Sequence, residues 1–551
     1  MSYISPSGNI WLLHNVPIDK TYQNTLYWSN NQAGKDAQKA FFLGTTALPS
    51  SYVKYSFTNQ YYSRHTRGSI RVQILADNVL DCNYLVFQNS SFGAGKYFYA
   101  FITSVEYINN SVTQINFELD VIQTWYFDFE LEPCFVERMH TASDAKYSNI
   151  VPEPLEPGEY IYQNISHELI TQNLVVLIAV TEVTNGESQG KLYGHIYGGC
   201  SLYGCLPNDT VGINRKISEY IAQPDAVVSI YMCPRCLISS DVDFEDNPGV
   251  AQAITNADVI TGLADLNFAL PDLNTTYMKQ FGSYTPHNNK LYSYPFTMLE
   301  VFTPEGSKAD YRYEFFNNLG QGNAVFQIGG SVTTPVELML VPKNYKIGSV
   351  SSTVNNLITE SISLKDYPLC SWNVDAYKAW VAQNAVPLGI GILGDMVAGT
   401  ASVVMNPMMN GSGLLNSLLH TVSDVVSQSY SASIAADQLH GQTKGSANVA
   451  SEVQGFYFAH KIINESSARL IDSFFDRFGY AIKQITTISR KNRKYFTYIK
   501  TVGCTLHGGV PSEDEDLICK LHDAGITYWD SSQAGGAIGN FSLAVGNIPV
   551  S

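Results

Sequence analysis

Four cysteines have the residue type and spacing that come closest to a chemical site. Cys200 and Cys205 form a C-x4-C pair, and Cys233 and Cys236 follow as a C-x2-C pair. Four thiolates would give zinc the tetrahedral coordination that it prefers. The first spacing is wide for a zinc knuckle, however, and VVSIYMCPRCLI is also typical of a buried strand in which a thiol is a small apolar side chain. We therefore favour structural cysteines, with zinc as the alternative, and predict no metal site.

Two other motifs fall short of known chemistry. FGAGKYF at Phe92–Phe98 lacks the glycine spacing and the following Ser or Thr of a phosphate loop, so we expect a turn between strands. His167 and Glu168 are not followed by the second histidine of a metalloprotease helix, because Thr171 stands in its place. Carboxylates are plentiful, but sequence alone cannot place two of them at a glycosidase separation. We find no catalytic constellation and predict a protein that is not an enzyme and has no cofactor.

The charge balance argues against a protein that grips nucleic acid. The chain has 33 Lys and Arg against 49 Asp and Glu, a net charge of −16. Its only dense basic cluster is Arg490, Lys491, Arg493 and Lys494. Sequence-independent binding depends on the neutralisation of phosphates, and a cluster of this size is more often a solvated turn or strand end.

Composition points to β-structure and oligomerisation. Charged residues make up only 15% of the 551 residues, and the chain contains 35 Tyr, 26 Phe and 6 Trp. Tyrosine suits half-buried strands and broad interfaces. The chain is long enough for several domains. The first residues lack the basic region and apolar core of a secretory signal, so we expect synthesis in a cytoplasm.

Hydrophobic periodicity divides the chain. Alternating runs such as SYVKYSF, SIRVQILA and VTQINFELDVIQTWYF predict successive antiparallel strands in the first part. Strands continue with NLVVLIAVTEV and AVVSIYMCP, and resume at Lys290–Pro304. From about Gly445 the pattern is helical, through Ile462, Ile463, Leu470, Ile471, Phe474 and Phe475 to a break at Gly479. DEDLICKLHDAG predicts a short helix that ends at Gly525.

The segment from 379 to 443 is almost free of charge. Between Lys378 and Lys444 it contains no Lys, Arg or Glu, and its only acidic residues are Asp395, Asp424 and Asp437. Turn residues at Asn406–Gly413 separate a glycine-rich arm from an amphipathic helical arm. The candidate membrane-interacting residues are its large apolar side chains: Leu388, Ile390, Ile392, Leu393, Met396, Val397, Val403, Val404, Met405, Met408, Met409, Leu414, Leu415, Leu418 and Leu419.

Two interpretations of this segment stay open. It is either an element buried within a domain or between subunits, or a loop that is shielded in the assembled protein and released to enter a bilayer. A permanent anchor fits less well, because the segment lacks basic flanks on its own arms. An exposed apolar patch of this size would aggregate, so both interpretations require shielding.

Several blocks together carry a resemblance. The runs FELDVIQTWYFDFELEPCFVERMH, KLYSYPFTMLEVFTPEG, DSFFDRFGYAIKQI, YFTYIKT and DAGITYW occur in this order, with the long apolar segment before the last three. In this the chain resembles the distal tail knob proteins of phi29-like short-tailed phages over nearly its whole length. The region from 158 to 289, with its four cysteines, matches least.

The resemblance implies a fold, a location and partners. The fold is mainly β with some α, in several antiparallel barrel-like or sandwich-like domains that build a homohexameric tube. The implied parts are an N-terminal β tube domain (1–157), an inserted β-rich knob domain (158–289), a second β tube domain (290–378), the hydrophobic loop (379–443) and a C-terminal α+β part (444–551). The protein would lie at the distal end of the virion tail, be assembled in the host cytoplasm and contact other tail proteins.

The resemblance also implies a function. Phage DNA would pass through the lumen without sequence-specific binding. The apolar loops, here about Val386 to Leu439, would plug the channel and on release penetrate the host cytoplasmic membrane. The alternatives are a tail component that degrades the cell wall or binds glycans, and a secreted pore-forming toxin. His420 and His440 frame the second arm and are candidates for an acid trigger.

Overall fold

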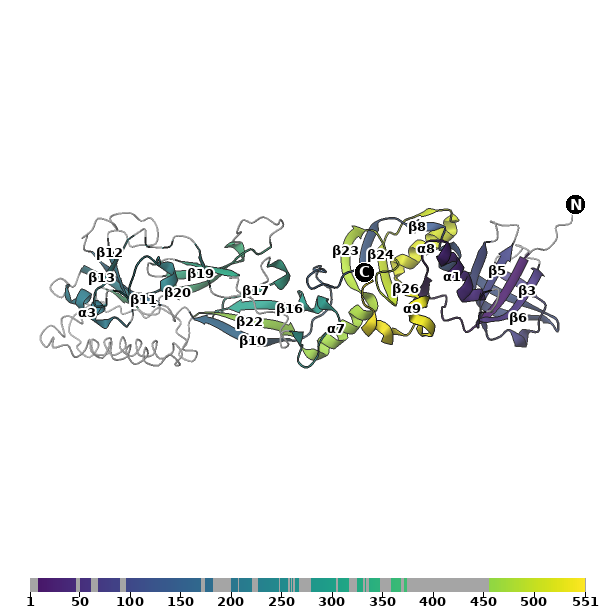
Figure 1. The fold of residues 1–551 in the computed structure, drawn as a ribbon, viewed down its shortest axis with the longest axis horizontal. Coiled ribbons are helices and arrows are strands. Elements are labelled where there is room, and N and C mark those ends of the chain that lie inside the picture. Colours follow the sequence, from purple (N-terminus) through teal and green to yellow (C-terminus); the bar gives the residue numbers. More distant parts are fainter. Residues whose placement is uncertain are drawn as a thin grey trace, which may run out of the picture. The chain divides into compact units, whose positions relative to one another are not determined.

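The chain folds into two compact units, each built from discontinuous segments. The computed structural model describes residues 8–45, 50–60, 68–89, 96–169, 174–181, 200–206, 208–220, 226–246, 248–255, 258, 260, 263–266, 279–303, 306–316, 325–330, 332, 336–346, 358–367, 371–373 and 455–550. The first unit comprises Met1–Gly158, Gln280–Pro295 and Asn464–Ser551, and the second comprises Glu159–Lys279 and Phe296–Ile463 (Figure 1). The segment from 379 to 443 and all its candidate membrane-interacting residues lie outside the described residues.

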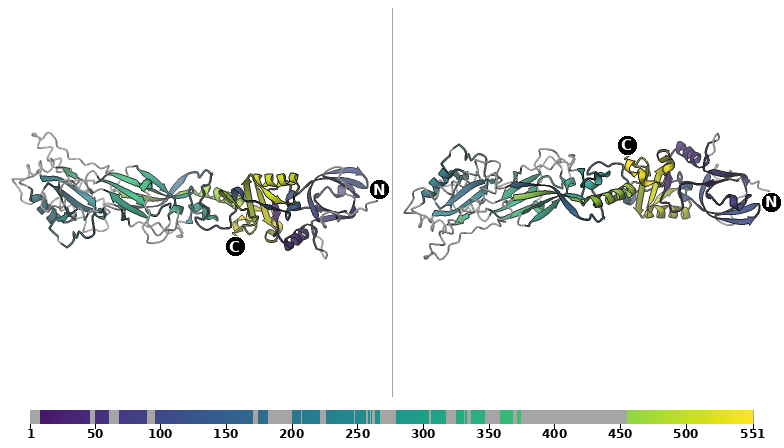
Figure 2. Two further views of the ribbon diagram at one scale, coloured as in Figure 1. Left: turned by 90° about the horizontal axis from the view of Figure 1, so that it is seen from above. Right: turned by 90° about the horizontal axis from the view of Figure 1, so that it is seen from below.

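The first unit begins with a six-stranded antiparallel sheet. Its strand order is β3-β1-β5-β6-β7-β4, and Figure 2 shows that the sheet is curved. One face packs around Ile10, Leu12, Leu85 and Ile115, which are all buried. The successive strands predicted from the sequence are confirmed as β3 to β7, and burial alternates most regularly in β7. The strands of this sheet are β1 (Gly8–His14), β3 (Val53–Gln60), β4 (Ser69–Val72), β5 (Cys82–Asn89), β6 (Tyr97–Asn109) and β7 (Val112–Leu119).

A five-stranded sheet joins distant parts of the sequence within the same unit. Its order is β2-β26-β24-β9-β23, and only the β2–β26 pair is parallel. Its core includes Val136, Phe496, Ile526 and Trp529 and continues onto the second face of the six-stranded sheet. The strands are β2 (Thr25–Tyr27), β9 (Cys134–Met139), β23 (Tyr480–Thr486), β24 (Phe496–Val502) and β26 (Ile526–Asp530). A small ribbon pairs β8 (Phe129–Leu131) with β25 (Leu506–Gly508).

Helices of the first unit carry recognisable caps. Asn31 caps α1 (Gln32–Leu43), and Asn464 caps α7 (Glu465–Phe478). The predicted helix that ends at Gly525 is confirmed as α8 (Ser512–Ala524), which packs against β24. Its first turn contains Glu513, Asp514 and Glu515, which favour the positive end of the helix dipole. A last short helix is α9 (Ser531–Ala534).

Two expectations from periodicity are wrong in part. The strand expected to continue through VIQTWYF ends at Leu119, because the buried Asp120 accepts a hydrogen bond from the Gln123 amide at 3.0 Å and starts helix α2 (Val121–Trp125). The helix expected from about Gly445 is a strand, β22 (Gly455–Ile463), before Asn464 starts α7. β22 is a central strand between β10 and β16, and its consecutive residues Phe458, Ala459 and His460 are all buried. Both of its faces are therefore covered, so it has no clear alternation. Leu470, expected on the apolar face of this helix, is exposed.

The second unit contains three further sheets. Their orders are β10-β22-β16-β17, β14-β12-β11-β13-β21 and β15-β18-β19-β20. Its one described α-helix is α3 (Thr210–Ser218). The first sheet contains β10 (Tyr160–Leu169), β16 (Thr297–Phe302) and β17 (Lys308–Tyr311) beside β22. The other strands are β11 (Leu174–Val180), β12 (Ser201–Cys205), β13 (Val227–Pro234), β14 (Gln252–Ile254), β15 (Ala264–Asp265), β18 (Phe326–Gly330), β19 (Val336–Pro342), β20 (Ile362–Tyr367) and β21 (Ser371–Asn373).

The fold is therefore mainly β with some α and contains several sheet domains, as the sequence predicted. Among the residues that the structure describes, none of the helices has the length and apolar character needed to span a membrane.

Candidate functional site

The cysteines singled out in the sequence do not form one site. Cys205 pairs with Val176 and Cys233 pairs with Val175 across the shared strand β11. Adjacent residues of a strand point to opposite faces, so these two thiols lie on opposite faces of their sheet. Burial raises the pKa of Cys205 to about 12 and holds the pKa of Cys233 well above its ordinary value. Cys205 and Cys233 therefore cannot ligate one zinc ion together, and both behave as apolar side chains.

The basic cluster is largely engaged within the first unit. Arg490 stacks on Tyr126 and Phe129, with its guanidinium carbon 4.7 and 4.4 Å from the ring centroids. Lys491 forms an ion pair of 2.6 Å with Asp530. Arg493 is buried. Three of the four basic side chains are therefore engaged by groups of the protein itself.

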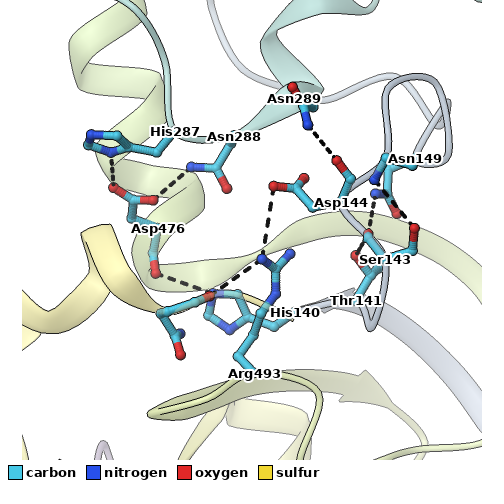
Figure 3. Close-up of polar contacts among 12 residues, drawn as sticks. His140, Thr141, Ser143, Asp144, Asn149, His287, Asn288, Asn289, Asp476 and Arg493 are labelled. Atoms are coloured by element: carbon cyan, nitrogen blue, oxygen red, sulfur yellow. Dashed lines mark hydrogen bonds and ion pairs between the residues drawn. The ribbon is translucent and has the colours of Figure 1, made fainter. Parts of the chain in front are cut away.

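A buried polar cluster joins several segments of the first unit (Figure 3). It gathers side chains from three segments: the chain after β9 (His140–Asn149), the short segment Tyr284–Asn289, and α7 with its continuation to Arg493. The first two segments and α7 border the points where the chain leaves and re-enters this unit.

Asp472 on α7 is the centre of the cluster. It is fully buried, and its carboxylate accepts hydrogen bonds from the Tyr284 hydroxyl at 2.5 Å and from the backbone amides of His287 and Asn288 at 2.7 and 3.1 Å. The Asn288 side-chain amide donates a further bond of 2.8 Å. Charge-assisted bonds of this kind are stronger than neutral ones. They attach the segment Tyr284–Asn289 to the helix.

Asp476 lies one helical turn farther along α7. Its carboxylate accepts from the Asn288 amide at 2.7 Å and lies 3.2 Å from His287 Nδ1. Figure 3 shows both side chains turned towards this carboxylate. Burial, together with the neighbouring charge of Asp472, raises the pKa of the Asp476 carboxyl, although the Asn288 bond opposes this shift. The His287 side chain is half-exposed and therefore more accessible to solvent than that of Asp476.

Tyr480 connects the helix side of the cluster to Asp144. Its hydroxyl lies 2.5 Å from Asp144 Oδ1 and 2.8 Å from Asn288 Oδ1. Burial raises the pKa of the Asp144 carboxyl, and the bond from Tyr480 partly offsets this effect. The backbone carbonyl of Asp144 also accepts from the Asn289 amide at 2.6 Å.

His140 is held neutral with one tautomer. Its Nδ1 accepts from the Tyr498 amide at 2.8 Å, so Nε2 carries the hydrogen that it donates to the Asp476 carbonyl at 3.2 Å. Burial, together with the nearby Arg493, lowers the pKa of His140 to about 3. Both ring nitrogens are occupied, so His140 is not positioned as a general base for a substrate.

Arg493 supplies the positive charge nearest to Asp144. Its Nη1 lies 4.0 Å from Asp144 Oδ2 and 3.5 Å from the Asn547 carbonyl to which it donates. Its Nε and Nη2 have no hydrogen-bond partner among the described residues.

The chemistry of this cluster is structural. Its carboxylates and its buried histidine are engaged by protein groups, and within the described ranges no group of three His, Cys, Asp or Glu side chains could hold a metal ion. The cluster fastens three segments of the first unit together. Sequence reasoning missed it, because its members are far apart in the chain. The only available signal was that Asp472, Asp476 and Tyr480 fall within one conspicuous block, DSFFDRFGYAIKQI.

Comparison with known proteins gives consistent matches. Residues 266–544 match the family model of the C-terminal domain of the Bacillus phage phi29 tail knob protein gp9, and residues 6–130 match that of the caudoviral major tail protein N-terminus. The chain is 24% identical to the tail knob protein gp9 of Bacillus phage B103 over 97% of this chain and 98% of the relative. It is equally 24% identical to that of phage phi29, over 98% and 99%.

A solved structure has a similar fold. The tail knob protein gp12 of bacteriophage C1 superposes with a TM-score of 0.59 over 98% of this chain and 100% of that chain, at 13% identity. At this identity the match supports the fold alone.

Proposed function

The chain belongs to the family of phage tail knob proteins typified by gp9 of phi29, and from this premise we propose that six copies form a tube at the distal end of the tail that conducts DNA. As a family member it is a structural protein of the virion tail. The observation that carries the proposal is the charge-poor segment 379–443, which lies inside the range matched by the tail knob family model.

The composition of the chain supports a conduit. A net charge of −16 repels the DNA backbone. The basic cluster that was the best candidate for holding phosphates is engaged by Asp530 and by aromatic rings. DNA would therefore pass through the lumen without sequence-specific binding.

The apolar loops act as a plug and then as a membrane-penetrating element. Inside the lumen they are shielded from water, which avoids aggregation of the large apolar side chains from Leu388 to Leu419. Once released, they enter the host cytoplasmic membrane. Assembly in the host cytoplasm precedes both steps.

Electron microscopy tests the tube. The purified chain is expected to form a six-fold ring with a central channel. A protein that is monomeric at all concentrations would contradict this proposal.

Liposome leakage tests the loop. Ile392→Lys and Leu418→Lys are expected to preserve the ring and reduce dye release, because a charge costs about 2.5 to 3.5 kcal/mol at a bilayer centre. Asn416→Lys, on the polar side of the predicted second arm, is the matched control and should leak like the unaltered protein. If deletion of 386–419 leaves leakage unchanged in an intact ring, membrane entry is wrong.

A further inference from the structure

Three cysteines of the first unit come together at the end of β24. Cys134 is the first residue of β9, Cys504 follows β24, and Cys519 lies on α8. All three are free thiols, and the proposed function does not use them. Two thiols can form a disulfide only if the fold already places them side by side, so the packing around β24 decides which of them can react.

Asp523 fastens α8 to the turn that carries Cys504. Its carboxylate accepts from the Thr501 hydroxyl at 2.7 Å and from the backbone amides of Gly503 and Cys504 at 3.2 and 3.1 Å. Cys519 lies four residues before Asp523 on the same helix, and side chains at this spacing share one helical face. Cys519 is therefore on the face of α8 that is bonded to this turn.

Cys134 reaches the same turn from the neighbouring strand. Phe135 pairs with Val502 in the antiparallel ladder of β9 and β24. In such a ladder the residue before Phe135 lies beside the residues that follow Val502. Cys134 and Cys504 are both buried, whereas Cys519 is half-buried on the outer side of the core.

The three thiols interact directly. The Cys504 thiol interacts by hydrogen bonding with the thiols of both Cys519 and Cys134. Burial raises the pKa of Cys504, and the neighbouring Cys519 and, to a smaller extent, Cys134 raise it further. Cys519 is therefore the thiol that interacts most strongly with Cys504.

Exposure makes Cys519 the thiol that an oxidant reaches first, because oxidation of cysteines follows their accessibility. Burial raises the pKa of Cys519, and the carboxylates of Glu515 and Asp523 add to this shift, although the bond from Cys504 opposes it. The thiolate is the reactive form, so the reaction is slow at neutral pH. A thiol of raised pKa is also a poor leaving group, so a disulfide between such thiols exchanges slowly once it has formed.

We propose that Cys504 and Cys519 are a site of oxidative modification, at which a peroxide joins them in a disulfide. The Cys519 sulfur attacks the peroxide and breaks its O–O bond, which gives a sulfenic acid, and the hydroxide released takes up the Cys519 proton to form water. The Cys504 sulfur then attacks the sulfenic sulfur. The S–O bond breaks, and the hydroxyl group leaves with the Cys504 proton as a second water. Two thiols are thus oxidised to one disulfide, and one peroxide is reduced to two waters.

The crosslink would tie α8 covalently to the end of β24. It closes a loop over residues 504–519, which contains β25 and the first part of α8. Thiols stay reduced in the cytoplasm, whereas disulfides persist outside cells. As part of a virion tail the chain leaves the cell with the particle, and the bond is expected in released particles. Both cysteines lie within the first unit, so this inference does not depend on the tube or on the apolar loop.

Peptide mass spectrometry of the full chain tests the site. The folded protein is treated with hydrogen peroxide, unreacted thiols are alkylated with iodoacetamide, and the chain is cut with trypsin. Trypsin leaves both cysteines in the peptide Thr501–Lys520, which has no internal Lys or Arg. This peptide should escape alkylation and be about 2 Da lighter than its reduced form, and dithiothreitol should reverse both effects. Cleavage at Glu513 and Glu515 should then give two fragments that stay joined until they are reduced.

Serine variants identify the partner of Cys504. Cys519→Ser should abolish the crosslink, whereas the matched control Cys134→Ser should retain it. Peroxide should raise the melting temperature of the unaltered chain by about 5 °C, because the disulfide constrains the unfolded state, and should leave that of Cys519→Ser unchanged.

Three results would overturn this inference. They are alkylation of both cysteines after peroxide treatment, their separate oxidation to sulfinic acids without a crosslink, and a crosslink from Cys504 to Cys134 instead. None of these results bears on the proposed tube, which electron microscopy tests independently.

Discussion

Asp120 is the residue whose titration should most clearly affect stability. Its carboxyl is fully buried and accepts from the Tyr84 hydroxyl at 2.8 Å, and burial raises its pKa to about 7. The folded state thus holds this proton more tightly than the unfolded state, whose carboxyl titrates near pH ~4. The stability contributed by the proton is complete below pH ~4 and is lost as the pH rises to about 7.

The free energy of unfolding is expected to fall by a few kcal/mol between pH ~4 and pH ~7, since each unit of pKa shift corresponds to about 1.4 kcal/mol. Asp120→Asn keeps the shape of the side chain and removes the titration. The free energy of unfolding is measured for both proteins by urea denaturation from pH 4 to 8. Its difference between the two proteins should change up to pH ~7, and above pH ~7 the two curves should be parallel. Parallel curves across the whole range would contradict the buried proton.

The ion pair between Arg138 and Glu153 is a second test at the scale of single residues. Both side chains are buried; Arg138 also donates to the Gly479 carbonyl at 2.6 Å, and Glu153 accepts from the Ala481 amide at 2.8 Å. Glu153→Ala leaves a buried guanidinium without its counter-charge and is expected to cost about 3 to 5 kcal/mol in urea denaturation. Glu156→Ala, at an exposed position nearby, should change stability by less than about 0.5 kcal/mol.

Among the elements, the end of α8 depends on a glycine. Gly525 has a φ of 100°, and a Cβ added there would collide with the Tyr498 hydroxyl. Gly525→Ala is therefore expected to destabilise the protein by about 2 to 4 kcal/mol, from the left-handed backbone and the clash together. Gly503→Ala is the matched control: its φ is 67°, but a Cβ there would meet no atom, so it should cost only about 1 kcal/mol in the same thermal or urea melt. Equal costs would mean that the contact with Tyr498 is unimportant.

The sequence predicts those elements whose pattern has a local cause. Strand β7 is buried at every second residue through most of its length, and α8 has acidic residues at its start and Gly525 at its end. β22 was mistaken for helix because burial on both faces removes the alternation that identifies a strand. The turn at Asp120 was missed because one capping carboxylate, rather than a change of hydrophobicity, ends the strand.

The polar cluster could not be predicted for a different reason. Asp144, Asn288 and Asp472 meet only because the chain leaves the first unit and returns to it twice. No local sequence pattern indicates which polar residues will form hydrogen bonds with residues that are far away in the sequence. The polar cluster is seen in the structure but not in the sequence. For the candidate membrane segment the reverse holds, because its lack of charge is evident in the sequence while its residues lie outside those that the structure describes.

At the scale of the whole molecule, the division into two units predicts two unfolding transitions. Each unit has its own sheets, and the first is fastened by the polar cluster around Asp472. Asp472→Ala would leave the Tyr284 hydroxyl and the amides of His287 and Asn288 without their acceptor. Of these three residues, Asn288 is buried, Tyr284 is half-buried and His287 is exposed, so only the Asn288 backbone amide becomes an unpaired buried donor. Such a donor costs about 1 to 3 kcal/mol, and this is the loss of stability that we expect.

Differential scanning calorimetry shows whether Asp472→Ala lowers the stability of one unit or of both. If the units unfold separately, Asp472→Ala should lower one transition and leave the other unchanged. Asp310→Ala in the second unit, whose side chain is 44% exposed, is the control and should shift neither transition by more than about 2 °C. A single transition that moves as a whole would mean that the two units unfold cooperatively. The polar cluster would then stabilise the entire chain, because the chain passes between the two units four times.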